Sequence, residues 1–398
     1  MANERTSQLD AIAGGNKTLD EHVQDISHAL KSSVSQSSPL AESGQLFDGG
    51  VLTSSNESCF KALYHAIMPT NWIHEESKEY RFGNYVVNRK TSETMWEDMP
   101  LYTRIGMHLL FACMVDRQLL HTHRLQHLFA EESIRQGLHF DAPESTAQIP
   151  HFIKTYSLDT SDLLEQDLSK YRSFNEFFYR KLKADARPIH EKDNPNVIVS
   201  AADCRLTAFE SITSATEIWI KGKSFTLDRL LQDDELVQTF TGGAIAIFRL
   251  APQDYHRFHS PVRGKVLRDP KKIDGTYFTV NPMAVNEDLD VFTENVRMIS
   301  VLELDQPQEG DNQEGLGHQC VFVSIGALLV GSIELTGAKE KGNRVEKGDE
   351  LGYFAYGGST CVLLFQKDSV QFDEDLIQSS KAKLETLVQM GEQIGVFL

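Results

Sequence analysis

The sequence predicts an α+β protein in which a helical region precedes a β-rich half. Two observations support this fold class. Between Tyr102 and Leu138, apolar residues recur near helical spacing and proline and glycine are almost absent. After Arg187-Pro188, short runs of β-branched and bulky apolar residues bounded by glycine, proline or charge take their place. With 398 residues, 40% of them apolar, the chain can form a large core, or two domains and a tail.

The chain divides into three predicted parts. Residues 1–58 are rich in serine, glutamine, asparagine and glycine and have few apolar residues spaced for a buried face, which predicts a polar, mobile tail. Residues 59–190 form the mainly helical region. It contains one long or two shorter helices over Tyr102–Leu138, a short helix Ile149–Tyr156, and a helix around Ser173–Leu182 in which Ser173 can serve as the N-cap.

Residues 191–398 form the predicted β-rich catalytic domain. Its expected strands are Val197–Val199, Glu217–Ile220, Ala244–Leu250, Val321–Ile325 and Cys361–Phe365. The polar segment Leu304–His318 has no apolar pattern and is predicted to be a surface loop.

Composition excludes several classes of protein. Lys and Arg total 39 against 57 Asp and Glu, a formal net charge of −18, which is opposite to the charge of a nucleic-acid binder. The five cysteines are odd in number and without C-x-x-C spacing, so neither a disulfide framework nor a zinc site is expected. No apolar run reaches the roughly 20 residues of a membrane span, and no signal peptide is recognisable. We therefore expect a cytoplasmic protein without a metal.

Basic residues gather in two short stretches in spite of the acidic total. They are either a solvated surface or a local attraction for anionic lipid headgroups, which would give peripheral contact with a membrane. The two groups are Arg263, Lys265, Arg268, Lys271 and Lys272, and Lys170, Arg172, Arg180, Lys181, Lys183 and Arg187.

The densest chemical signal is the segment from Arg249 to Pro261, which follows an apolar run. Its His256 and His259 lie beside an aspartate, a tyrosine and two arginines. Loops after strands present catalytic groups on a rigid scaffold, and histidine exchanges protons near neutral pH. The alternative is that these histidines only cap backbone groups. His121, His123 and His127 lack the glutamate of a zinc-protease motif and are read as helix-surface residues.

Two further signals are weaker when taken alone. Gly357-Gly358-Ser359-Thr360 lies between two apolar runs, but a hairpin turn would explain the same residues, and Cys361 breaks the G-x-S-x-G pattern of a hydrolase. Asp203 follows an apolar run, where a turn aspartate is common.

Together these motifs resemble the phosphatidylserine decarboxylase family, from about Asp98 to the C-terminus. The resemblance rests on several segments in the same order. They are Phe177–Leu182 with Arg187-Pro188, Ser200–Arg205, Tyr255–His259, Tyr277–Pro282, Glu294–Arg297, Gly326–Ser332 and Lys347–Thr360.

The resemblance implies a self-processing proenzyme, a carboxy-lyase that converts phosphatidylserine to phosphatidylethanolamine and releases CO2. The chain would cut itself between Gly358 and Ser359, and Ser359 would become a pyruvoyl group, the cofactor. By the same resemblance, Asp203, His259 and Ser359 form a Ser-His-Asp-like relay, and His256 donates the proton that replaces CO2. The large and small chains would remain associated.

The resemblance also predicts a fold, and the chain departs from the common family motifs at three positions. Val345–Tyr353 and Pro261–Val266 resemble the hairpins of lipoyl- and biotinyl-type domains, so the core is expected to resemble a barrel-sandwich hybrid with the helical region packed beside it. Ala201 and Cys204 depart from the common S-P-A-D-G pattern, and Gly357 departs from L-G-S-T. A branch of the family with Cys-Arg after the aspartate and G-G-S-T at the cut matches better.

Two alternative functions stay open at this point. The chain could decarboxylate a soluble aromatic amino acid, which the net charge of −18 favours because anionic lipid repels an acidic protein. It could also be an unprocessed, non-enzymatic binding scaffold. A carrier domain needs a modifiable lysine at its hairpin tip, however, and Ser359 occupies the informative turn.

Overall fold

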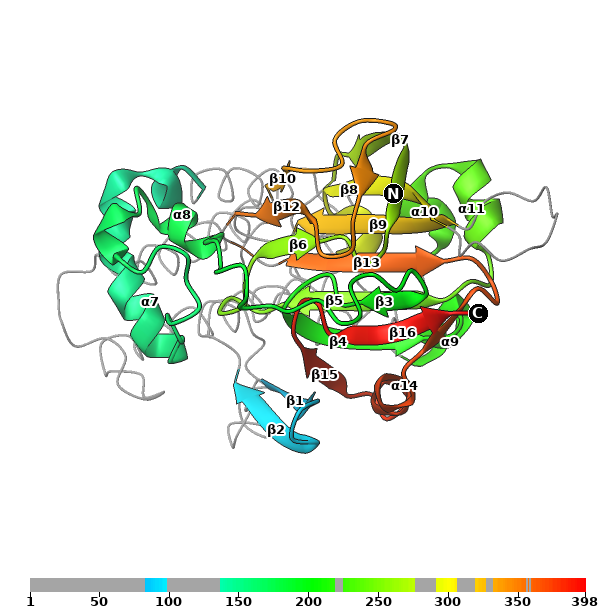
Figure 1. Cartoon of the computed structure of the whole chain (residues 1–398), viewed down its shortest axis with the longest axis horizontal. Helices are drawn as coiled ribbons and strands as arrows, with labels where there is room; N and C mark the ends of the chain where they lie inside the picture. The colour runs from blue at the N-terminus through cyan, green and yellow to red at the C-terminus, as the bar shows by residue number, and fades with distance from the viewer. Residues whose placement is uncertain are drawn as a thin grey trace, which may run out of the picture.

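The computed structural model describes residues 83–98, 137–218, 225–275, 291–305, 319–326, 332–355, 357 and 359–398. The predicted tail, nearly all of the predicted helices over Tyr102–Leu138 and most of the predicted loop Leu304–His318 lie outside these ranges. Within them, helices and a sheet-rich core confirm the α+β class (Figure 1).

The core is built on one large, open sheet of ten strands. All neighbouring strands in it run antiparallel except β1 and β15, which are parallel. In spatial order the strands are β11 Arg344–Val345, β7 Gly264–Ile273, β8 Arg297–Leu304, β9 Gln319–Gly326, β13 Ser359–Phe365, β5 Ile245–Leu250, β4 Cys204–Phe209, β15 Glu385–Val388, β1 Gly83–Asn88 and β2 Glu93–Asp98.

Two three-stranded sheets cover one face of the large sheet. They are β10 Ile333–Leu335 with β12 Glu350–Phe354 and β6 Arg257–His259, and β14 Val370–Phe372 with β16 Gln393–Phe397 and β3 Val197–Val199. Phe258 of β6 stacks on Phe322 of the large sheet at 5.6 Å, and Phe372 of β14 contacts Phe365 at 6.1 Å. The strands of the described residues thus form layered open sheets, and they do not close into a barrel.

Four of the five predicted strands are confirmed. Val197–Val199 is β3, and the runs Ala244–Leu250, Val321–Ile325 and Cys361–Phe365 supply β5, β9 and β13. These strands are buried on both faces, which explains their nearly continuous apolar sequence.

The predicted strand Glu217–Ile220 is wrong over its described part, which belongs to helix α9 (Ile212–Ile218). The Ser211 hydroxyl accepts a hydrogen bond from the backbone N–H of Ser214 (3.1 Å) and so starts the helix. Ile212 and Ala215, three residues apart, are both buried. This local capping and helical spacing outweigh the β-branched residues that suggested a strand.

Short helices pack on both faces of the large sheet. Their bounds are α10 Leu227–Leu231, α11 Asp234–Phe240, α13 Val291–Glu294 and α14 Glu374–Lys381. Buried Arg297 of β8 donates to the carbonyls of Leu230 (2.8 Å) and Thr293 (2.7 Å), which ties α10 and α13 to the sheet. Leu376 and Ile377 of α14 join the core on the opposite face.

A separate helical layer lies to one side of the sheets, near β6 and β12 (Figure 1). It contains η1 Pro143–Gln148, α7 Ile149–Tyr156, η2 Leu168–Lys170 and α8 Phe174–Phe178. The predicted helix Ile149–Tyr156 is confirmed, and Ser173 caps α8 by accepting from the Glu176 N–H (3.2 Å), although α8 ends four residues before the predicted Leu182. Among the described residues, no helix is long and apolar enough to cross a bilayer.

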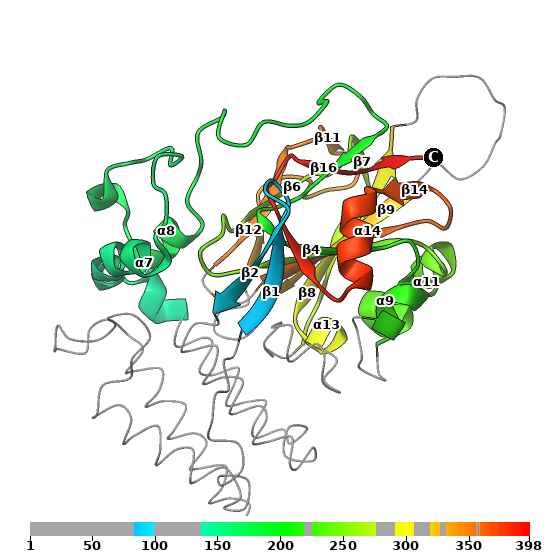
Figure 2. The ribbon, with the colours of Figure 1, turned by 90° about the horizontal axis from the view of Figure 1, so that it is seen from below.

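A β-hairpin precedes this helical layer in the sequence, within the range expected to be mainly helical. It consists of β1 and β2 (Figure 2), and β1 pairs with β15, so that β2 forms the edge of the large sheet. Arg89 in its turn donates to Asp373 (2.7 Å) and Asp375 (2.8 Å) next to α14. The hairpin is therefore part of the β-rich core.

Candidate active site

Ser359 is the first residue of β13, in the middle of the large sheet. It lies opposite Leu250 of β5 on one side and Gly326 of β9 on the other. The residue is fully buried, and its Oγ makes no hydrogen bond with the described residues. Buried hydroxyls are normally satisfied, so an unpaired one needs an explanation, and a role in the chemistry would supply it for Ser359.

A tight turn begins beside Ser359, because Leu250 leads directly into residues 251–256. The Asp254 carboxylate accepts from the Ala251 N–H (2.7 Å), and the Asp254 N–H donates to the Ala251 carbonyl (2.9 Å). Arg180, which follows α8, donates to the carbonyls of Gln253 (2.9 Å) and Asp254 (3.1 Å). Side chains from both the sheet and the helical layer therefore fix the shape of this turn.

His256 ends the turn and is fully buried. Its Nδ1 lies 3.0 Å from the Asp254 carbonyl. Since a carbonyl can only accept, Nδ1 carries the proton and Nε2 has a lone pair, which makes no hydrogen bond with the described residues. The ring packs against Phe178 with centroids 3.9 Å apart, and burial lowers the pKa of His256 to about 3. The imidazole is therefore neutral at physiological pH.

His259 lies at the end of β6 and is held at both ring nitrogens. Its Nδ1 donates to the Gly348 carbonyl (2.8 Å), and its Nε2 accepts from the Tyr255 hydroxyl (3.0 Å). Burial lowers the pKa of His259, while the charges of Glu350 and Asp203 oppose this effect. His259 is thus a neutral base whose acceptor nitrogen is engaged by a tyrosine.

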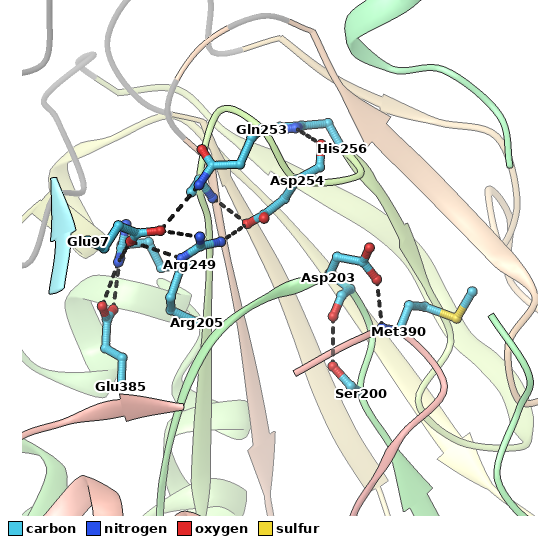
Figure 3. A network of polar contacts seen from close by, with 12 residues as sticks. Glu97, Ser200, Asp203, Arg205, Arg249, Gln253, Asp254, His256, Glu385 and Met390 are labelled. Carbon is cyan, nitrogen blue, oxygen red and sulfur yellow. Dashed lines mark hydrogen bonds and ion pairs between the residues drawn. The ribbon is translucent and has the colours of Figure 1, made fainter. Parts of the chain in front are cut away.

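Asp203 directly precedes β4 and is paired with Arg187. Arg187 Nε donates to both carboxylate oxygens (3.0 Å each), and Arg187 Nη2 donates at 2.7 Å. The Met390 N–H also donates to this carboxylate, at 2.9 Å (Figure 3). Among the described residues, Asp203 makes no hydrogen bond to His259. The two residues lie on neighbouring segments, since the His259 N–H donates to the Ala201 carbonyl (2.8 Å).

The sheet register brings the predicted site residues to one end of the large sheet. Leu206 of β4 is opposite Phe248 of β5, so β4 begins level with Leu250, where Ser359 also starts β13. Asp203, the 251–256 turn and Ser359 consequently share this end. Gly358, the other residue of the predicted cut, lies outside the described residues.

Several residues at the site were not assigned a role from the sequence. Arg187 binds Asp203, Tyr255 and Gly348 bind His259, and Lys347 is buried with its Nζ donating to the carbonyls of Glu191 (2.8 Å) and Asn194 (2.7 Å). Arg187, Tyr255 and Lys347 do belong to the segments that carry the family resemblance. That position is the only sequence signal that points to them.

Most described side chains of the first basic stretch are paired with acids. Arg263 binds Glu346 (2.7 Å), Lys265 binds Glu303 (2.8 Å) and Arg268 binds Asp233 (2.9 Å). In the second stretch, Arg180 and Arg187 point inward to the site. The pairing favours the solvated-surface interpretation of the first stretch.

The structure describes no group of three or more His, Cys, Asp and Glu side chains that could hold a metal ion. The histidines 121, 123 and 127 lie outside the residues that it describes.

Comparison with known proteins identifies the family. The family model described as phosphatidylserine decarboxylase matches residues 174–396. The chain is 44% identical over 310 residues to phosphatidylserine decarboxylase proenzyme 3 of Schizosaccharomyces pombe, covering 78% of this chain and 30% of that protein. It is 37% identical over 368 residues to proenzyme 2 of Oryza sativa, covering 88% of this chain and 55% of the relative.

A bacterial relative is covered more completely. The chain is 39% identical over 259 residues to the phosphatidylserine decarboxylase proenzyme of Fusobacterium nucleatum, covering 65% of this chain and 81% of that protein. By contrast, it spans about a third or less of the fungal relatives that it matches. The match across the whole β-rich half, including every predicted site residue, shows that the chain belongs to the phosphatidylserine decarboxylase family.

Proposed function

We propose that this chain is a self-processing decarboxylase that converts phosphatidylserine to phosphatidylethanolamine with release of CO2. The observation that carries the proposal is the Ser359 hydroxyl, which is buried at the start of β13 with no hydrogen-bond partner among the described residues. Family membership supplies the reaction class, and the Gly358-Ser359 sequence supplies the bond to be cut.

Self-cleavage begins when the acyl group of Gly358 moves from the backbone nitrogen of Ser359 to the Ser359 Oγ. Ser359 Oγ bonds to the Gly358 carbonyl carbon, its proton passes to a base, and the peptide C–N bond breaks as the nitrogen gains a proton. The Ser359 Cα proton then passes to a base and the Cβ–O bond breaks, which releases residues 1–358 as a carboxylate and leaves a Cα=Cβ double bond. A proton moves to Cβ to give an imine, and water hydrolyses the imine, which releases ammonia and leaves a pyruvoyl group at position 359.

We propose His259 as the base and Asp203 as the residue that stabilises its charged form. The Gly348 carbonyl fixes the His259 tautomer and leaves Nε2 as the proton acceptor. In this role Nε2 has to exchange the Tyr255 hydroxyl for that of Ser359. Asp203 acts on His259 through its charge, which raises the His259 pKa against the effect of burial.

Ser359 is a fitting precursor for the pyruvoyl group because its buried hydroxyl has no competing hydrogen-bond partner among the described residues. The group supplies an electron sink for the charge left when CO2 departs. His256 is our candidate to return a proton to that carbon. Because the imidazole is neutral with its proton on Nδ1, Nε2, which has no hydrogen-bond partner among the described residues, has to take up a proton before it can return one.

The cleaved chains are expected to remain associated. The small chain, residues 359–398, contributes β13 to the middle of the large sheet, where it pairs with β5 and β9 of the large chain. Its β15 pairs with β4, and its β16 pairs with β3. Cleavage at one end of β13 leaves all of these ladders intact.

Because phosphatidylserine is a membrane lipid, the proposal includes peripheral contact with a bilayer. Exposed Leu164 lies next to Lys181, whose carbonyl accepts from the Leu164 N–H (2.9 Å), and Lys183 is also exposed there. An apolar group beside cations suits an anionic membrane surface. Co-sedimentation with phosphatidylserine vesicles, compared with phosphatidylcholine vesicles, tests this contact.

Intact-mass spectrometry under denaturing conditions tests the processing. We expect a small chain matching residues 359–398 and lighter by one ammonia than the hydrolysed peptide. Ser359→Ala should remain one chain. Thr386→Val is the matched control, since Thr386 also carries a buried hydroxyl without a partner among the described residues, and it should be cleaved like the wild type.

Release of CO2 from labelled substrate then tests the reaction. Phosphatidylserine in vesicles should be decarboxylated, and free aromatic amino acids should not. An uncleaved wild-type chain would refute the processing, and preference for a free amino acid would refute the substrate.

A further inference from the structure

A largely buried ionic network connects the β1–β2 hairpin to the turn beside Ser359 (Figure 3). Glu97 of β2 accepts from Arg205 of β4 through both Nε (3.0 Å) and Nη2, and from Arg249 Nη2 of β5 (3.3 Å). It also accepts from Gln253 Nε2 in the turn (3.2 Å). One carboxylate thus binds two guanidinium groups and the turn itself.

The two arginines each have a second acidic partner. Arg205 Nη1 binds the Asp254 carboxylate, and Arg249 binds Glu385 of β15 through Nε (2.8 Å) and Nη2 (2.5 Å). The Arg205 side chain is 6% exposed, that of Glu385 2% and that of Glu97 21%. The network is therefore largely shielded from water, which makes its charge balance important.

Asp254 connects the network to the turn Ala251–His256. Its carboxylate receives Arg205 and also accepts from the Ala251 N–H, while its carbonyl lies 3.0 Å from His256 Nδ1. The contacts therefore run without interruption from Glu97 through Arg205 and Asp254 to His256. At the other end of the turn, Leu250 is paired directly with Ser359.

Glu97 balances two like charges that the sheet holds close together. Arg205 and Arg249 are opposite each other on β4 and β5, so their guanidinium groups repel. Burial alone would raise the pKa of Glu97, but the charges and hydrogen bonds of these two arginines outweigh it and lower the pKa. Without this carboxylate, Arg205 is free to move away from Arg249 and to take Asp254 with it.

We propose that Glu97 is a positioning residue for self-cleavage, which it supports by holding the turn Ala251–His256 in place through Arg205 and Asp254. This inference rests on the proposed function. It assigns a role to a hairpin that precedes the family-matched region 174–396. The ten-stranded sheet would then depend on a strand that lies outside the region matched by the family model.

The test follows cleavage of newly made full-length chain in a cell-free translation reaction, by gel and by intact mass. Glu97→Gln keeps the size of the side chain and an acceptor for Gln253 but removes the charge. We expect its cleavage to be at least about tenfold slower than that of the wild type, because small displacements at a reacting centre cost one to two orders of magnitude. Glu97→Asp, which keeps the charge, should recover part of the rate.

Two controls separate positioning from general stability. Glu93→Gln makes the same change at an exposed position of the same strand and should cleave at the wild-type rate. Val370→Ala removes buried apolar volume in β14, away from the turn, and should lower the unfolding midpoint without slowing cleavage of the folded chain.

The outcomes distinguish this inference from the proposed function. If wild-type chain is not cut between 358 and 359, the proposed function fails. If the wild type is cut and Glu97→Gln matches Glu93→Gln, the positioning role is wrong. The role is equally wrong if Glu97→Gln only lowers the unfolding midpoint, as Val370→Ala does, and leaves the cleavage rate unchanged.

Discussion

In a Ser359→Ala precursor, replacing Arg187 with methionine should lower the free energy of unfolding by about 3 kcal/mol. Arg187 and Asp203 side chains are both only 12% exposed, and Arg187 donates three hydrogen bonds to this carboxylate. Breaking a buried ion pair costs about 3–5 kcal/mol, since it leaves one charge unpaired. The lower end applies because Asp203 retains the Met390 N–H.

The assay is urea unfolding, in which Ser359→Ala keeps every variant as one chain. A double-mutant cycle of Arg187→Met with Asp203→Asn should give a coupling energy of about 2 kcal/mol. The same cycle with His259→Gln in place of Arg187→Met should give less than about 0.5 kcal/mol, because Asp203 makes no hydrogen bond to His259. Arg172→Met is the control, since Arg172 is 84% exposed in its pair with Glu176 and should barely move the midpoint.

Reversed couplings would refute this reasoning. A strong Asp203–His259 coupling together with a weak Asp203–Arg187 coupling would mean that the precursor already contains the relay. Equal losses for Arg187→Met and Arg172→Met would mean that burial of the Asp203 pair contributes nothing measurable.

Three further predictions concern the surroundings of the two histidines. The folded pKa of His256 is lowered from 6.5 to about 3, so the unfolded chain binds the extra proton in that window and stability should rise with pH. His256→Gln in the Ser359→Ala precursor should therefore reduce the slope of unfolding free energy by up to about 1.4 kcal/mol per pH unit, and equal slopes from pH 4.5 to 6.5 would contradict it. Phe178→Leu, which trims the ring packed on His256, should cost about 1–2 kcal/mol in urea unfolding, and no loss would show that this contact is not tightly packed. Gly348→Ala should cost about 1–3 kcal/mol, because φ is +88° and the new Cβ would lie 2.6 Å from Ile189 Cδ1. Adding Ile189→Ala should recover only part of that loss in the same assay, since it removes the clash but not the backbone strain.

Capping residues and apolar runs in the sequence predicted most of the elements that such local features determine. Ser173 identified the start of α8, and the apolar run Cys361–Phe365 identified a buried strand. The same reasoning was wrong at Glu217–Ile220, where β-branched residues suggested a strand and the Ser211 cap together with helical burial produced α9. Nearby residues that favour different structures leave such short segments ambiguous.

The ordered motifs identified the family and supplied candidate site residues, but they did not show how those residues are paired. Asp203 was expected beside His259, whereas Arg187 binds it, and an aspartate in a sequence does not reveal which of several nearby cations it meets. Glu97 is 108 positions from Arg205, and no periodicity or spacing connects them. Such contacts arise from sheet order, which is set by the whole chain. The division into a tail, a helical region and a catalytic domain stays a prediction.

The central position of β13 would also determine how a protein cleaved before Ser359 loses its fold. The cleaved product would have been folded as one chain, and once the 358–359 bond is gone its innermost strand belongs to a separate polypeptide of 40 residues, 359–398. An unfolded mature molecule would have to find that strand again by diffusion, without the short connection that guided it the first time. Unfolding of such a cleaved protein would be effectively irreversible, so its lifetime would be set by its rate of opening rather than by an equilibrium between folded and unfolded states.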